Sequence, residues 1–161
     1  MKFTSLFTTI FVLTLVSGCG MGIKHYRHDG PKNIEILSDV NAGENLFVSF
    51  SNYFHVYKVK PDCSGIEHLG GYEITGMKSA QLSLPTNELL LIELAFSKNV
   101  MRTENLERRD AFIKPKQGES YKFDFYYRKT AIDLKLYKKG KKKDSEIPII
   151  RWSEEACKKI I

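Results

Sequence analysis

Three cysteines are the residues whose chemistry depends most on where they stand in the chain: Cys19, Cys63 and Cys157. A thiolate is a strong nucleophile, and two thiols in an oxidising compartment form a disulfide. Cys19 follows an aliphatic residue, Val16, and two small residues that let a peptidase approach the bond before it. The sequence upstream of Cys19 therefore decides what each of the three thiols does.

The first 18 residues have the composition of an export signal. One basic residue, Lys2, precedes an uncharged stretch over residues 3–16 that is rich in Leu, Ile, Val, Phe and Thr, and small residues end it. The stretch is shorter than the roughly 20 apolar residues that a transmembrane helix needs. We therefore expect residues 1–18 to be a signal peptide that is removed.

The four residues Val16-Ser17-Gly18-Cys19 resemble the lipobox of bacterial lipoproteins. The resemblance implies that the Cys19 thiol carries a diacylglycerol thioether and that this lipid holds the protein in a membrane facing the periplasm. Gly20 follows in place of the Asp that resembles an inner-membrane retention signal, which favours the outer membrane over the inner membrane. The alternative is an ordinary cleaved signal peptide that leaves Cys19 as a disulfide partner.

Export leaves Cys63 and Cys157 in an oxidising compartment once Cys19 carries lipid. Two cysteines allow one pairing, so we predict a disulfide between Cys63 and Cys157. Closing this long loop stabilises the fold by about 4–5 kcal/mol, because it lowers the entropy of the unfolded chain. The alternative is two free thiols that are buried apart from each other.

Five lysines fall within six positions around Gly140. They are Lys138, Lys139, Lys141, Lys142 and Lys143. Such a cluster can bind anionic lipid head groups or phosphate, with up to about 1 kcal/mol from each lysine at a charged membrane. Alternatively, it is the solvated tip of a hairpin between Leu136 and Ile147, where charge discourages pairing with the edge of another sheet.

The histidines and acids form no motif as specific as the one around Cys19. His25 and His28, with Asp29, have the spacing of metal ligands, but they lie in a flexible segment that would not hold such a geometry. His55 and His68 fall in adjacent predicted strands and can approach each other. A histidine pair without carboxylate or Cys support more often has a structural role than a catalytic or metal-binding one. The chain has no Gly-x-Ser-x-Gly, His-Glu-x-x-His or phosphate-binding glycine motif. We therefore expect a non-catalytic protein with no metal and no cofactor.

Composition and charge define the class of molecule. A hydrophobic fraction of 42% with 27% charged residues excludes a disordered chain, and 161 residues suit one domain. The net charge of +6 falls to +5 without residues 1–18, and charge of this size and spread does not indicate nucleic-acid binding. We expect a lipidated tether over residues 19–32, where hydrophobic patterning is weak, and one folded domain over residues 33–161.

Alternation of apolar and polar residues predicts the elements of this domain. The clearest run is 121–127, and residues 132–137 repeat its pattern and should pair with it antiparallel. Residues 89–96 are apolar on both sides except at Glu93, which predicts a central strand. The other expected strands are 46–50, 53–59, 66–74 with a bulge or an end at Gly70-Gly71, and 80–84. Residues 98–110 lack alternation and are expected to be a loop or a short helix.

A short helix is predicted at the end of the chain. Ser153 is a suitable N-cap, acids follow it in the first turn, and lysines occupy the last turn, which suits the helix dipole at both ends. The predicted disulfide through Cys157 would hold this helix on the domain. Seven or eight short strands with one terminal helix indicate an all-β protein, an antiparallel β-sandwich.

Aromatic side chains offer a further candidate surface. Most of them should lie in the core, but Tyr126 and Tyr137 fall on the predicted polar faces of their strands. Exposed tyrosines are frequent at interfaces because they combine a large apolar ring with a hydroxyl group. We therefore expect Tyr126, Tyr137 and the five lysines to form a binding surface.

The order of strands and turns resembles that of small envelope lipoproteins with a transthyretin-like or PEGA-like β-sandwich. The resemblance depends on Leu84-Pro85 before a long apolar strand, and on Gly118-Glu119-Ser120-Tyr121 at the start of an aromatic strand. It implies a lipid-anchored, non-catalytic binding or scaffolding module with an envelope protein as its partner. The alternative is an immunity or inhibitor lipoprotein that neutralises a periplasmic toxin or cell-wall hydrolase. The sequence leaves the oligomeric state open.

Overall fold

Alternating sequences form most of the structure, a computed structural model that describes residues 24–40, 48–75, 78–100, 103–128 and 131–161. Residues 1–18, predicted as a signal peptide, and the predicted lipidation site Cys19 lie outside the described residues. The elements are β1 (Ile34–Val40), β2 (Val48–Val59), β3 (Ile66–Glu73), β4 (Ser79–Leu82), β5 (Leu90–Val100), β6 (Thr103–Ile113), β7 (Tyr121–Arg128), β8 (Ala131–Lys138), β9 (Ser145–Ile147) and α1 (Glu154–Ile160).

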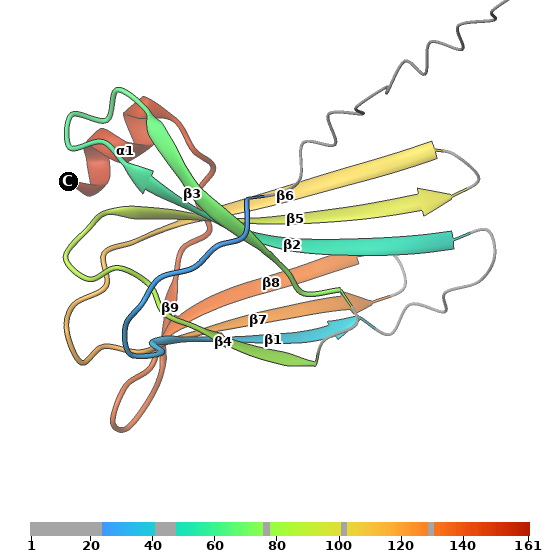
Figure 1. The fold of residues 1–161 in the computed structure, drawn as a ribbon, viewed down its shortest axis with the longest axis horizontal. Helices are drawn as coiled ribbons and strands as arrows, with labels where there is room; N and C mark the ends of the chain where they lie inside the picture. Colours follow the sequence, from blue (N-terminus) through green and yellow to red (C-terminus); the bar gives the residue numbers. More distant parts are fainter. Residues whose placement is uncertain (1–23, 41–47, 76–77, 101–102, 129–130) are drawn as a thin grey trace, which may run out of the picture.

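The strands form two sheets that face each other (Figure 1). One has five strands in the order β4-β1-β7-β8-β9, and the other has four in the order β3-β2-β5-β6. Every pair of neighbouring strands is antiparallel except β1 and β7, which are parallel. The predicted all-β sandwich with a short terminal helix is confirmed, with nine described strands in place of the expected seven or eight.

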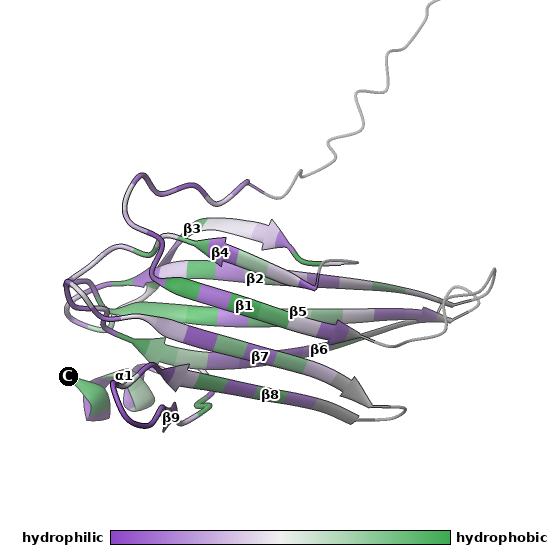
Figure 2. Ribbon diagram, turned by 90° about the horizontal axis from the view of Figure 1, so that it is seen from below, coloured by the Kyte–Doolittle hydropathy of each residue, from purple (hydrophilic) through white to green (hydrophobic). Residues whose placement is uncertain are grey.

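Large side chains from alternate positions fill the space between the sheets. Phe54 of β2 packs edge to face against Phe123 of β7, with ring centroids 5.5 Å apart, and both are buried. Phe125 and Leu136 extend this core along β7 and β8. Purple and green bands along β8 in Figure 2 show the alternation that places one face of the strand in the core. The predicted pairing of residues 121–127 with 132–137 is confirmed.

Two sequence predictions are wrong at the level of elements. Residues 48–50 and 53–59, expected in two strands, belong to one strand, β2, which continues through the buried polar residue Asn52, while residues 46–47 lie outside the described ranges. Residues 98–110 were expected as a loop or a short helix, but residues 98–100 form the end of β5 and residues 103–110 form most of β6, while 101–102 lie outside the described residues. At the edge of the sheet, residues 106–109 are exposed on both sides of β6, so backbone hydrogen bonds to β5 hold the strand while its side chains show no alternation.

Part of the segment expected to be a tether, residues 24–26, packs on the sandwich. The amide of Tyr26 donates to the carbonyl of Gly71 at 2.8 Å, and the amide of Gly71 donates to the carbonyl of Lys24 at 2.7 Å. Tyr26 is buried in the core, and its hydroxyl donates to the carbonyl of Ser83 at 2.7 Å. The neighbouring Gly70 permits this contact, since a Cβ at that position would lie 2.6 Å from the Cα of Tyr26.

The chain after β9 crosses the edge of the four-stranded sheet and covers part of its outer face. This C-terminal segment, residues 148–161, contains α1, whose N-cap Ser153 accepts a hydrogen bond from the amide of Ala156. The predicted disulfide is present, with the Cα atoms of Cys63 and Cys157 5.9 Å apart. It lies in a second apolar cluster with Val59, Leu91 and Phe112, on the outer side of this sheet. The disulfide therefore pins the C-terminal segment to the sheet.

Candidate functional site

Cross-strand register brings polar and charged side chains together on the outer face of the four-stranded sheet. In β5, Ile92 and Leu94 are buried in the main core, so the odd-numbered positions between and beside them point outward. Glu93 pairs with His55 of β2 on one side and with Asp110 of β6 on the other. Residues from three separate stretches of the sequence thus lie in one row of the sheet face, and Tyr57, which pairs with Leu91, lies in the next row.

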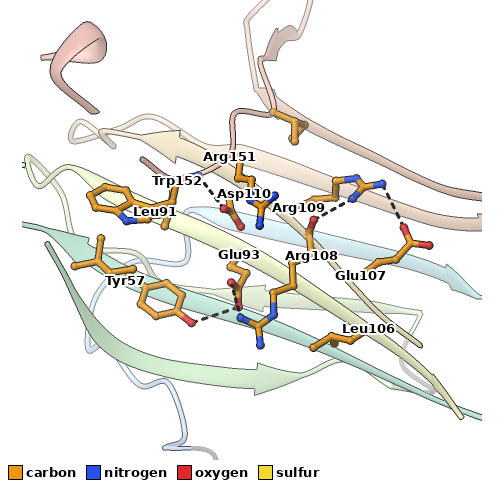
Figure 3. Close-up of a pocket in the computed structure, with 12 residues that line it drawn as sticks. Tyr57, Leu91, Glu93, Leu106, Glu107, Arg108, Arg109, Asp110, Arg151 and Trp152 are labelled. Carbon is orange, nitrogen blue, oxygen red and sulfur yellow. Dashed lines mark hydrogen bonds and ion pairs between the residues drawn. The ribbon is translucent and has the colours of Figure 1, made fainter. Parts of the chain in front are cut away.

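A hollow of about 1110 Å³ lies over these rows (Figure 3). Tyr57 and Leu91 belong to its lining from the sheet, and Arg151 and Trp152 from the C-terminal segment. Trp152 is half-buried and packs against Phe112, with ring centroids 5.8 Å apart. We call this feature the β6 hollow, because β6 contributes more of its lining than any other element.

Asp110 is the most buried charged residue of the β6 hollow, with 9% of the residue exposed. Its Oδ2 accepts a hydrogen bond from the backbone amide of Trp152 at 3.0 Å, and its carbonyl accepts one from the amide of Ile150 at 2.9 Å. Its Oδ1 is buried and has no hydrogen-bond partner within the part of the chain that the structure describes. Asp110 therefore holds the C-terminal segment with one carboxylate oxygen and leaves the other oxygen as an unsatisfied acceptor.

Glu93 lies beside Asp110, and its side chain is 13% exposed. The Tyr57 hydroxyl donates to its Oε1 at 3.3 Å, and Nη1 of Arg108 lies 3.7 Å from its Oε2. Burial raises the pKa of the Glu93 carboxyl above its ordinary value, while the charge of Arg108 opposes this shift. Burial, and then the charge of Glu93, raise the pKa of the Tyr57 hydroxyl to about 12, so Tyr57 is a neutral hydrogen-bond donor at physiological pH.

Two histidines continue the polar row away from the hollow. Nδ1 of His55 and Nε2 of His68 are 3.2 Å apart, so their predicted approach is confirmed. The His68 ring lies 4.9 Å from the Tyr57 ring. Burial, followed by the charge of His68, lowers the pKa of His55. A hydrogen bond between two imidazoles needs one donor and one acceptor, and so at least one neutral ring.

The predicted lysine cluster lies at the tip of the hairpin formed by β8 and β9, on the other sheet. Lys138 donates to Glu119, and Lys139 donates to Glu35 at 2.7 Å. Together with Tyr121, Lys138 lowers the pKa of the Glu119 carboxyl to about 2. Lys141, Lys142 and Lys143 are exposed, so the structure leaves three of the five lysines directed toward solvent.

Tyr126 and Tyr137 lie on the outer face of the five-stranded sheet, as predicted, and both are half-buried. Tyr126 pairs with Asp133, which stands four residues from Tyr137 along β8. At about 3.3 Å per residue, this separation is roughly 13 Å along the strand. The two tyrosines therefore share a face with each other, but that face belongs to the opposite sheet from the β6 hollow.

The remaining candidates do not converge on a site. His25, His28 and Asp29 are exposed in the N-terminal segment, and Asp29 forms an ion pair with Arg27. The described part of the chain contains no group of three or more His, Cys, Asp and Glu residues arranged to hold a metal ion. Within the same ranges, no helix is long and apolar enough to cross a membrane.

Sequence reasoning missed most of the β6 hollow. Asp110 and Arg108 fell in the stretch expected to be a loop or helix, and Trp152 carried no motif. One signal was present, because Glu93 is the only charged residue in the apolar run 89–96. A charged side chain in a central strand needs a polar neighbour, which would have drawn attention to its cross-strand partners.

Comparison of the chain with protein-family models, curated proteins and solved structures finds no match. The fold and the hollow therefore define its class only as an all-β sandwich with a disulfide-pinned C-terminal segment. The resemblance to transthyretin-like or PEGA-like envelope lipoproteins stays a prediction.

Proposed function

We propose that this protein is a lipid-anchored module of the cell envelope that binds a partner or ligand close to the outer membrane and performs no catalysis. The observation that carries the proposal is the packing of the N-terminal segment. Lys24 and Tyr26 are held against β3, and Lys24 follows Cys19 by only five residues. Five residues span at most about 18 Å when fully extended. A lipid on Cys19 would therefore keep the sandwich beside the membrane surface.

The construction of the β6 hollow supports binding. The C-terminal segment that lines the hollow is held by the disulfide and by two hydrogen bonds to Asp110. Such a preformed site lowers the entropic cost of binding. Among the described residues that line it, none is Ser, Thr, Cys or His, the side chains that most often serve as nucleophile or base in acyl transfer. Confinement at a membrane raises the effective concentration of such a module for envelope partners.

Lipidation is tested with the Cys19→Ala variant in the native host. The wild-type protein should incorporate labelled palmitate and fractionate with the outer membrane after a high-salt wash, and the variant should do neither. A Cys63→Ser, Cys157→Ser variant is the matched control, because it removes the other two thiols and keeps Cys19. Unlabelled wild-type protein, or a Cys19→Ala variant that stays in the membrane fraction, would overturn the anchor.

The binding role is tested by crosslinking the tagged, lipidated protein in living cells. Recovery of an envelope component would support the module. Recovery of one toxin or cell-wall hydrolase, together with a growth defect only when that enzyme is present, would instead favour an immunity or inhibitor lipoprotein.

A further inference from the structure

We propose that the β6 hollow binds a neutral, hydroxyl-rich ligand, an oligosaccharide of the envelope. The inference rests on the proposed function in one respect, because an envelope protein is exposed to such glycans. It is carried by three features around one open hollow: a buried carboxylate oxygen with no hydrogen-bond partner among the described residues, an arginine with no ion pair among them, and two aromatic side chains.

The buried acceptor on Asp110 is a place where a ligand could donate a hydrogen bond. Oδ1 of Asp110 is buried and has no hydrogen bond to any residue in the described ranges, although Oδ2 of the same carboxylate accepts from the Trp152 amide. A buried acceptor without a partner is unfavourable, and a ligand that brings a donor to it removes that cost. Figure 3 shows Asp110, Glu93 and Arg151 directed into the same space. Oδ1 itself is covered in the structure, so a ligand in the hollow makes this hydrogen bond when the Asp110 side chain turns toward it.

The charges that line the hollow are balanced, which argues against an ionic ligand. Two of its three acids have arginine partners within it, Glu93 with Arg108 and Glu107 with Arg109. The third acid, Asp110, and the third arginine, Arg151, form no ion pair within the described residues. The arginines would repel a cation, and the carboxylates would repel an anion.

A hydroxyl group fits this combination because it both donates and accepts hydrogen bonds. One hydroxyl can donate to Oδ1 of Asp110 while a neighbouring one accepts from the guanidinium of Arg151. Neutral sugars present such hydroxyls at the edges of their rings.

The apolar part of the lining fits the faces of sugar rings. Tyr57, Leu91 and Trp152 offer flat or apolar surface beside the polar groups, and aromatic residues of this kind are suited to ligands that are apolar on one side and polar on the other. A volume of about 1110 Å³ lies slightly above the usual range for ligand sites, roughly 300–1,000 Å³. The hollow therefore has room for more than one ring.

The chain supplies a reporter for this site, because Trp152 is its only tryptophan. The mature, lipidated full chain in a detergent without a sugar head group is titrated with chitotetraose, cellotetraose and maltotetraose, and tryptophan fluorescence is recorded. Tetralysine and tetraglutamate serve as charged probes. We expect a saturable fluorescence change with at least one neutral tetrasaccharide and none with the charged peptides.

Asp110→Asn tests the acceptor, since the amide keeps an oxygen for the Trp152 amide and places an NH2 group where Oδ1 stood. Losing a hydrogen bond to a charged acceptor should weaken binding about tenfold or more. Asp124→Asn is the matched control, because Asp124 is also buried with an unpartnered Oδ1 but lies on the other sheet. Arg151→Gln changes an exposed side chain, so it should fold normally and also weaken binding.

The proposal is overturned if no neutral tetrasaccharide changes the fluorescence, if only a charged peptide does so, or if Asp110→Asn and Arg151→Gln bind as tightly as Asp124→Asn. None of these outcomes affects palmitate labelling or envelope crosslinking. Failure of the glycan site is therefore distinguishable from failure of the anchored module.

Discussion

The hydroxyl of Tyr26 makes a buried hydrogen bond that ties the N-terminal segment to the chain beyond β4. Tyr26→Phe removes this bond and leaves the carbonyl of Ser83 without its donor. We expect the free energy of unfolding to fall by about 1–2 kcal/mol. Urea denaturation of the wild type and the variant measures the difference.

Tyr53→Phe is the control for this prediction. Tyr53 is half-buried on the outer face of the four-stranded sheet, and the structure shows no hydrogen bond of its hydroxyl to another described residue. The loss should therefore be within about 0.5 kcal/mol, as for other surface changes. Equal losses in the two variants would contradict a specific role for the Tyr26 hydroxyl.

His55 makes stability depend on pH. Its pKa is lowered in the folded protein from an ordinary value of 6.5, chiefly by burial and then by the charges of His68 and Arg108. As pH falls below about 6.5, the unfolded chain binds a proton at His55 before the folded protein does, so stability is lost. Above that pH the contribution is fully present. Urea denaturation between pH 7.5 and pH 5 measures the loss.

The His55→Asn variant isolates this effect, because other titrating groups remain, including Glu93 with its raised pKa. The raised pKa of Glu93 acts in the opposite direction, since protonation of a buried carboxyl stabilises the fold as pH falls. The variant should lose less stability than the wild type over the same range. His28→Asn should keep the wild-type profile because His28 is exposed. Parallel profiles for wild type and His55→Asn would refute the prediction.

At the scale of elements, Gly70 of β3 determines whether the N-terminal segment can pair with the sheet. Its φ of +151° is rare for other residues, and an added Cβ would lie 2.6 Å from the Cα of Tyr26. Gly70→Ala should therefore lower the free energy of unfolding by about 2 kcal/mol or more. Thermal and urea denaturation measure the loss, and increased amide exchange at Tyr26 and Gly71 would locate it.

Gly118→Ala separates the two causes. Gly118 also has a positive φ, +80°, but nothing lies within 4 Å of the position its Cβ would take. In the Gly118→Ala variant, the free energy of unfolding should fall only by the cost of the strained backbone, about 1–2 kcal/mol. A Gly70→Ala variant that is no less stable than Gly118→Ala would show that the contact with Tyr26 does not matter.

Edge and central strands differ in how well their sequences predicted them. The strands β5 and β7 were predicted because burial selects apolar residues at fixed positions, as at Phe123 and Phe125. The edge strand β6 was not predicted, because residues 106–109 are exposed and backbone hydrogen bonds to β5 select no side-chain type there. The β6 hollow was not predicted for the same reason, since Asp110 and Arg108 belong to β6.

At the scale of the whole molecule, the disulfide between Cys63 and Cys157 closes a loop of 94 residues and holds the C-terminal segment on the sheet. The Cys63→Ser, Cys157→Ser variant should lose about 2–5 kcal/mol of stability. The C-terminal segment should also detach before the two sheets unfold, because its remaining attachments are few. Trp152 fluorescence reports detachment, and far-UV circular dichroism reports the sheets.

Ser153→Ala is the companion variant, since it removes the N-cap of α1 and keeps the disulfide. It should cost about 1 kcal/mol, and its fluorescence and dichroism transitions should coincide. Coincident transitions in the disulfide variant as well, with unchanged stability, would show that the disulfide does not control docking of the C-terminal segment.

The alternation that makes a sandwich and the capping of the terminal helix could be predicted from the sequence, because local physics controls both. The predicted pairing of Cys63 with Cys157 is also present. Only the tertiary structure decided that Glu93, Asp110 and Trp152 share one hollow. The reason is that strand register and the crossing of residues 148–152 over β6 set these contacts. Register depends on how whole strands bury their apolar faces against one another, which no short motif records.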